Sequence, residues 1–192
     1  MNRQVSQVLT GTTTDAATAR LGRRVLAVAM AAALTAVAAK VAVPLPGIPV
    51  PFTLQPVAVL LAGALLGATG GLRSQSVYLA AGMAGLPVFA AGGGWAYLLG
   101  PTGGYLLAFP VAAWLVGTVS DRSRGAAGIA LGAVIGLAVI HLGGLAWLAA
   151  ISGREAAVAV GFAPFLVGDL LKILLVTVVG AGFGGRVRRW IG

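Results

Sequence analysis

The sequence predicts an all-α integral membrane protein with six transmembrane helices, on three observations: its composition, the lengths of its apolar segments and the positions of its arginines. The chain has 192 residues, of which 59% are hydrophobic and only 9% charged. A soluble domain carries about 25% charged residues, so most of this chain must face lipid or other apolar helices. Because it contains no cysteine, a disulfide framework and a thiolate metal site are both excluded.

Six apolar segments have the length that a membrane-spanning helix needs, which is roughly 17 to 25 residues. They cover residues 24–43, 56–72, 74–90, 105–120, 126–151 and 162–184. An even number of crossings places both termini on the same side of the membrane. We therefore expect a single membrane domain over residues 19–192.

The basic residues predict which side that is. Most of the 13 basic residues flank the segments on the side of the termini; these are Arg3, Arg20, Arg23, Arg24, Arg73, Arg122, Arg124, Arg186, Arg188 and Arg189. Only Arg154 lies in a connection on the other side, and Lys40 and Lys172 lie within segments. Since arginines collect on the cytoplasmic side, both termini are expected in the cytoplasm, with the protein in the cell (inner) membrane. This topology signal explains the formal charge of +9 better than nucleic-acid binding does.

The N-terminal region allows two interpretations. Residues 1–18 are polar and rich in threonine, which predicts a disordered cytoplasmic tail. Arg23 and Arg24 precede an apolar run, as in a cleaved signal peptide. However, the run extends from Val25 to Val43, and the charge asymmetry of the later segments requires its orientation. A retained transmembrane helix is therefore favoured.

Two uncharged gaps, residues 44–55 and 91–104, are expected to face outward. The stretch from Gly85 to Tyr105, GLPVFAAGGGWAYLLGPTGGY, is rich in glycine and aromatic residues. Irregular backbone at membrane depth is tolerated only where it is buried in protein or lines a cavity, because lipid leaves its amides unpaired. These gaps therefore predict a substrate pocket under an outward-facing lid.

Three ionisable residues are expected at membrane depth: Lys40, Asp169 and Lys172. Such groups are costly unless they are paired or hydrated. Asp169 and Lys172 are three positions apart, so they share one helix face. The pair either neutralises itself within the helix or offers an acceptor and a cation to a polar ligand. Lys40 either contacts the ligand or extends its ammonium group outward from the helix end.

Catalytic and nucleotide-binding motifs are missing from the sequence. His141 is the only histidine, and no Gly-x-Ser-x-Gly elbow accompanies the serines. No Gly-x-x-x-x-Gly-Lys-[Ser/Thr] run is present, so ATP-driven work would need a partner. We expect His141 to be a hydrogen-bonded contact between helices, and we expect no enzyme activity, metal or cofactor. An intramembrane enzyme that uses His141 with a serine is the alternative.

The first apolar segment contains alanines four positions apart, Ala27 with Ala31 and Ala29 with Ala33. Small residues at this spacing let another helix approach closely. The pairs therefore predict either packing within the protein or an interface with a partner.

Four segments resemble the signature segments of the BioY family, the biotin-binding S components of energy-coupling-factor (ECF) vitamin transporters. They are VPLPGIPVPFTLQP at 43–56, GLPVFAAGGG at 85–94, GPTGGYLLAF at 100–109 and PFLVGDLLK at 164–172. The resemblance implies a six-helix S-component fold, tight capture of biotin, and docking to a transmembrane T component that two ATPase subunits drive. It further implies that Ala27, Ala29, Ala31 and Ala33 contact the T component. The tail at 1–18 matches no segment of the family.

Biotin fits the residues of the predicted pocket. Asp169 can accept from a ureido N–H, and Lys172 can donate to the ureido carbonyl. Aromatic walls are expected from Phe52, Phe89 and Tyr105, with Trp95 and Tyr97 serving either as walls or as membrane-interface anchors. The biotin carboxylate has three candidate receptors: the amides of Gly92, Gly93 and Gly94, the hydroxyl of Thr102, or Lys40. Gln55 completes the predicted set of ligand contacts, and a different vitamin remains the alternative ligand.

Overall fold

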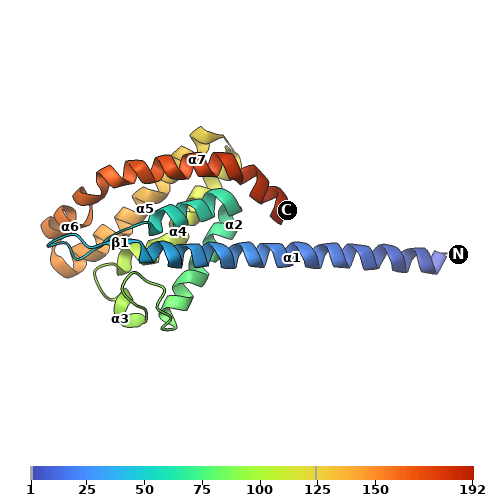
Figure 1. Cartoon of the computed structure of the whole chain (residues 1–192), viewed down its shortest axis with the longest axis horizontal. Helices are drawn as coiled ribbons and strands as arrows, with labels where there is room; N and C mark the ends of the chain where they lie inside the picture. The colour runs from blue at the N-terminus through green and yellow to red at the C-terminus, as the bar shows by residue number, and fades with distance from the viewer. Residues whose placement is uncertain (1, 124) are drawn as a thin grey trace.

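The computed structural model describes residues 2–123 and 125–192 and is almost entirely helical (Figure 1). Met1 and Arg124 lie outside the described residues, as do the side chains of residues 2–15, including Arg3, and of Ala156. The elements in chain order are α1 Asn2–Lys40, β1 Ala42–Val43, β2 Phe52–Thr53, α2 Gln55–Met83, α3 Trp95–Leu98, α4 Gly103–Arg122, α5 Ala126–Ser152, α6 Arg154–Gly161, the 3₁₀ turn η1 Ala163–Phe165, and α7 Leu166–Ile191.

Helix α2 is a hairpin of two helical arms that meet at Gly67. Its backbone there has φ 77° and ψ 179°, a conformation that is essentially restricted to glycine. In a straight helix Gln55 and Tyr78 would lie about 35 Å apart, at about 1.5 Å per residue. Instead, Gln55 Nε2 donates to the Tyr78 hydroxyl at 2.6 Å, so the second arm runs back along the first.

This hairpin accounts for the number of helices. Five helical stretches among the described residues are long and apolar enough to cross a membrane, with Gln55–Met83 counted once. Because α2 folds back at Gly67, its two arms supply the second and third of the six predicted helices. The predicted six-helix architecture is confirmed.

Glycines bring the central helices into close contact. A Cβ atom built on Gly63 would lie 2.2 Å from the carbonyl oxygen of Ala113 in α4, and one on Gly117 would lie 2.3 Å from the amide nitrogen of Ala68. Neither position has room for a side chain. The α2 arms and α4 therefore pack backbone to backbone, as small residues allow in membrane helices.

Helix α1 is joined to the second arm of α2 by a fully buried polar contact. Gln75 Nε2 donates to Thr35 Oγ1 at 3.1 Å and to Ser74 Oγ at 3.3 Å. All three side chains are 0% exposed. Since lipid offers no alternative partner, this contact fixes how α1 lies against the rest of the bundle.

The two ends of the bundle differ in character (Figure 1). The β1–β2 hairpin, α3 and α6 gather at one end, which carries the segments predicted to face outward. The C-terminus lies at the other end, where Arg24 Nε donates to the carbonyl of Ile191 at 3.1 Å. Arg188 forms an ion pair with Asp121 at this same end.

Several predicted boundaries were wrong. The break between the second and third helices falls at Gly67 rather than Arg73, and the third helix ends at Met83 rather than residue 90. The sixth helix begins at Leu166, after the separate helices α6 and η1. Residues 2–18, for which we predicted a disordered tail, continue α1 as helix that extends beyond the other helices (Figure 1). A single helix can extend in this way because its backbone hydrogen bonds are internal.

The hairpin at Gly67 makes a stability prediction. Gly67→Ala should lower the free energy of unfolding by about 1–3 kcal/mol, the usual cost of holding a residue in a sparsely populated backbone region. A Cβ there would also lie 3.0 Å from Asp121 Oδ1. Thermal or denaturant unfolding of the purified protein in detergent measures the effect.

Gly182→Ala is the matched control. Gly182 is helical, and a methyl group placed on it would have nothing within 4 Å, so this substitution should be neutral or stabilising. Equal stabilities of the two variants would contradict the hairpin.

Candidate functional site

A cavity lies between two lid segments and the helices α4, α5 and α7. The first lid segment comprises residues 41–54 and the second comprises residues 84–102. It encloses about 570 Å³ of space, counting the part that opens to the outside. Its free volume is about 50 Å³, which is smaller than that of an occupied small-molecule site, so a ligand would enter as the lid segments move apart. The lining residues are Val50, Pro51, Thr53, Gln55, Pro56, Ala90, Tyr97, Thr102, Tyr105, Leu106, Phe109, Leu137, Ile140, His141, Phe165, Asp169 and Lys172.

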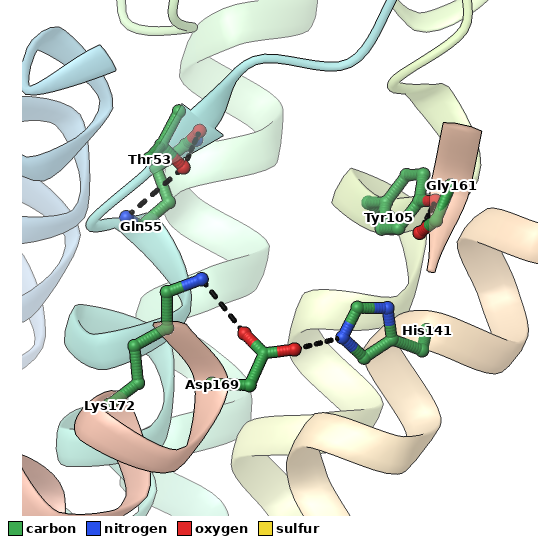
Figure 2. A network of polar contacts seen from close by, with 7 residues as sticks. All are labelled: Thr53, Gln55, Tyr105, His141, Gly161, Asp169 and Lys172. Atoms are coloured by element: carbon green, nitrogen blue, oxygen red, sulfur yellow. Dashed lines mark hydrogen bonds and ion pairs between the residues drawn. The ribbon is translucent and has the colours of Figure 1, made fainter. Parts of the chain in front are cut away.

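Asp169 lies at the centre of a buried polar cluster (Figure 2). Lys172 Nζ donates to Asp169 Oδ1 at 2.9 Å, and His141 Nε2 donates to Asp169 Oδ2 at 2.6 Å. Asp169 and Lys172 are each 5% exposed, and His141 is 8% exposed. An ion pair buried this deeply is stable only when its remaining lone pairs and protons are also satisfied, and His141 supplies one such hydrogen bond.

The local sequence places Asp169 at the beginning of α7. Pro164 lies in the 3₁₀ turn that precedes the helix, and Asp169 falls in the first turn of α7. A carboxylate is favoured there by the helix dipole. Lys172 follows one turn later on the same face, as the spacing predicted.

Aromatic rings surround the cation and the imidazole. Lys172 Nζ lies 4.2 Å from the centroid of the Phe52 ring, which stacks on Phe165 with an interplanar angle of 4°. The centroid of the His141 ring lies 5.1 Å from that of Phe162 and 6.3 Å from that of Tyr105. Aromatic surface therefore flanks the cluster, and the low exposure of its charged groups strengthens their electrostatic contacts.

Tyr105 is held in place by contacts on both sides of its ring. Its hydroxyl donates to the carbonyl of Gly161 at 2.7 Å (Figure 2). A Cβ on Gly144 would lie 2.1 Å from the ring, so this position in α5 admits only glycine. The tyrosine thereby connects α4, α5 and the end of α6 beside the cavity.

Gln55 connects the first lid segment to the second. Its Oε1 accepts from Thr53 Oγ1 at 3.3 Å, while its Nε2 donates to the Tyr78 hydroxyl. That hydroxyl donates in turn to the carbonyl of Val88 at 3.2 Å. Gln55 thus lines the cavity and also holds its cover in place.

Five of the predicted ligand contacts line the cavity together: Asp169, Lys172, Tyr105, Thr102 and Gln55. Phe52 reaches the same place through its contact with Lys172. The predicted aromatic and polar walls therefore converge, although they come from three different parts of the chain.

The remaining predicted contacts shape the second lid segment instead of lining the cavity. Lys40 Nζ donates to the carbonyl of Phe89 at 2.7 Å, and the Phe89 side chain is fully buried against Tyr78 and Tyr97. Gly94 donates its amide to the carbonyl of Gly82, and Gly92 pairs with Phe89. Gly93 lies against the carbonyl of Leu86, where a Cβ would approach to 2.1 Å. Their contact with a ligand stays a prediction.

Tyr97 and Trp95, which were expected to serve either as pocket walls or as membrane-interface anchors, occupy different environments. Tyr97 lines the cavity and stacks on Phe89, which agrees with its role as a wall. Trp95 is 66% exposed, which agrees with an anchor at the membrane interface.

His141 is the main site residue that the sequence analysis did not assign to the pocket. Its predicted role as a hydrogen-bonded helix contact is confirmed, since it joins α5 to α7 through Asp169. It also lines the cavity. The only sequence signal for a role in the pocket was the position of His141 within the apolar segment 126–151. No regular spacing in the sequence connects His141 to Asp169. Among the described residues, no three His, Cys, Asp or Glu side chains come together as a metal site.

The alanines of α1 do not share one face. Ala29 and Ala33 are exposed, Ala31 is partly buried, and Ala27 is 7% exposed and packs inside the bundle. Exposed Leu26, Met30 and Val37 accompany Ala29 and Ala33. The surface available to a partner at these alanines is therefore smaller than predicted, because only Ala29 and Ala33 are exposed.

Comparisons with known proteins agree with this arrangement. The chain is similar to the probable biotin transporter BioY of Pyrococcus horikoshii, with 40% identity over 165 residues that cover 85% of this chain and 98% of that protein. It is 35% identical to the biotin transporter BioY of Thermotoga maritima over 159 residues, 82% of this chain and 93% of that protein.

A solved structure has the same architecture. It is described as the S-component for biotin from an ECF-type ABC transporter, and it matches with a TM-score of 0.75 and 27% identity over 98% of this chain and 94% of that one. The family model described as the BioY family matches residues 7–189. The chain therefore belongs to the BioY family.

Proposed function

We propose that this protein binds biotin in the cavity beside Asp169 and serves as the substrate-specificity subunit of an ATP-driven biotin importer. The observation that carries the proposal is the Asp169–Lys172 pair, which is buried beside aromatic rings in the cavity under the lid segments. Support comes from relatives that are named biotin transporters and from the S-component structure that shares the fold.

The polar cluster matches the ureido ring of biotin, which has two N–H donors and one carbonyl acceptor. A carboxylate has about four acceptor positions, so Asp169 can accept a ureido N–H in addition to Lys172 and His141. Lys172 has three N–H donors, of which Asp169 uses one, so another can reach the ureido carbonyl. Phe165 and Tyr105 would cover the apolar faces of the bicyclic ring.

The carboxylate tail of biotin would extend toward the lid. Of the three candidate receptors, Thr102 is the one that lines the cavity. Lys40 and the glycines at 92–94 are engaged with the backbone of the second lid segment, so they would reach the tail only after that segment moved.

The proposed orientation follows the arginines: both termini in the cytoplasm and the lid outside, in the cell membrane. The sequence contains no P-loop, so ATP hydrolysis would come from ATPase subunits through a T component. We place the T component against the exposed side of α1 at Ala29 and Ala33, where small side chains allow close helix approach. The proposed role is binding and release of biotin rather than catalysis.

Asp169→Asn tests the ligand site. The substitution keeps the shape of the side chain but removes the charge, so the affinity for biotin should fall by about 1.5–3 kcal/mol, or about 10- to 150-fold. Isothermal calorimetry on the purified variant measures it. Asp121→Asn makes the same chemical change at the opposite end of the bundle and should leave the affinity unchanged. An Asp169→Asn protein that folds and binds with normal affinity would limit this residue to a structural ion pair.

A pair of bulky substitutions tests the docking surface. Ala29→Trp with Ala33→Trp should abolish biotin uptake by cells that carry the complete transporter, because tryptophan prevents close helix approach. Biotin binding by the isolated variant should persist, since both positions are exposed and neither lines the cavity.

The control for docking is Ala146→Trp with Ala150→Trp. These alanines have the same spacing and are exposed on α5, so uptake should continue. Recovery of the T component with the α1 variant at the wild-type yield would refute the docking surface.

A further inference from the structure

A second cavity lies at the opposite end of the bundle from the ligand site, between α1, the bend of α2 and the end of α7. It encloses about 1360 Å³, counting the part that opens to the outside. Its lining consists of Leu21, Arg24, Val25, Ala27, Val28, Leu66, Gly67, Ala68, Thr69, Gly70, Arg73, Asp121, Arg188, Ile191 and Gly192. The biotin site and the proposed docking surface use none of its arginines.

Three arginines line this cavity, and Asp121 is the one acidic side chain in its described lining. Asp121 is fully engaged, because it pairs with Arg188 and accepts the amide of Ala68 at 3.1 Å. Arg188 is also satisfied, since its Nη2 donates to the carbonyl of Ala64 at 2.9 Å. Asp121 and Arg188 therefore neutralise each other.

The other two arginines form no ion pair with any residue that the structure describes. Arg24 donates from Nε to the carbonyl of Ile191. Its two Nη groups make no hydrogen bond or ion pair within the part of the chain that the structure describes. Within the described ranges, Arg73 makes no hydrogen bond, ion pair or ring contact. Arg24 and Arg73 are both exposed, so the cavity presents two guanidinium groups that are free to bind an anion.

The walls of the cavity indicate what kind of anion. Leu21 is 63% exposed and Val25 is 61% exposed, and Leu66 and Ile191 add further apolar surface. A small soluble anion would satisfy the guanidinium groups but leave this surface uncovered. An anion that carries hydrocarbon chains would cover both.

We propose that this cavity binds an anionic phospholipid of the phosphatidylglycerol class. Its phosphodiester lies between Arg24 and Arg73, and an acyl chain runs along Leu21 and Val25. The planar guanidinium group matches phosphate oxygens and can bind them through two parallel hydrogen bonds. Basic pockets between transmembrane helices are typical sites for such headgroups. The lipid would thereby connect α1 to the bend of α2.

Native mass spectrometry of the full-length protein with defined lipids tests the site. The protein should retain phosphatidylglycerol through removal of detergent but lose phosphatidylcholine of the same chain length. At about 1 kcal/mol for each arginine, Arg24→Gln with Arg73→Gln should weaken phosphatidylglycerol binding about 30-fold. Binding of phosphatidylcholine should not change.

Arg122→Gln with Arg186→Gln is the control. Both residues are exposed near the same end of the bundle and neither lines the cavity, so this pair makes the same change in net charge and should bind phosphatidylglycerol as wild type does. Thermal unfolding confirms that each variant is folded.

Three results would overturn the proposal. They are retention of phosphatidylglycerol by the Arg24/Arg73 variant at the wild-type level, equal binding of the two lipids by wild type, or complete displacement of the lipid by millimolar inorganic phosphate, which would assign the site to a soluble anion.

Discussion

The buried carboxylate of Asp169 is the interaction on which the site depends. A lone charge at this depth would be unstable, so its partners must come from the elements that meet it: Lys172 from its own helix and His141 from α5. Phe52 then covers Lys172, which brings the first lid segment against α7. The same contacts that make the charge tolerable in the membrane therefore assemble the cavity and leave donor and acceptor positions for a polar ligand.

The bundle around this site is built on backbone contact. Gly63 and Gly117 each occupy a place where a side chain would collide with the backbone of a neighbouring helix, and Gly144 leaves room for the ring of Tyr105. Without a hydrophobic driving force between helices in lipid, such close packing supplies much of the association energy. Gly67 adds a sharp reversal that lets one apolar stretch supply two helices, so the chain gains a sixth helix without a long loop. The bundle thereby positions α4 and α5 beside the cavity.

The sequence was sufficient for features that depend on composition and local spacing. Apolar length and arginine placement predicted six helices, and the three-residue spacing predicted that Asp169 and Lys172 share a face. The bend at Gly67 was missed because Arg73 and several nearby glycines gave equally good local signals. Only the tertiary contacts of Gly67 with Asp121 and α4 distinguish it from those other positions. His141 was expected to make a hydrogen bond between helices but was not assigned to the pocket, because its pairing with Asp169 spans 28 positions and two helices, which no local pattern encodes.

The lid shows the same limit. Its glycines and aromatic residues predicted an irregular cover over a pocket, but not which side chains point inward. Lys40 binds the carbonyl of Phe89, and Phe89 packs into the core, because the second segment must satisfy its own backbone before it can serve a ligand. Tyr97 and Thr102 of the same segment reach the cavity instead.

Direct titration of the purified wild-type protein with biotin is the measurement that tests the central claim. Calorimetry in detergent, without ATP, metal or partner subunits, should show saturable binding of one biotin per chain, because the cavity contains all the required donors and acceptors. The absence of any signal with biotin, together with clear binding of a different vitamin, would contradict the assignment of this cavity to biotin.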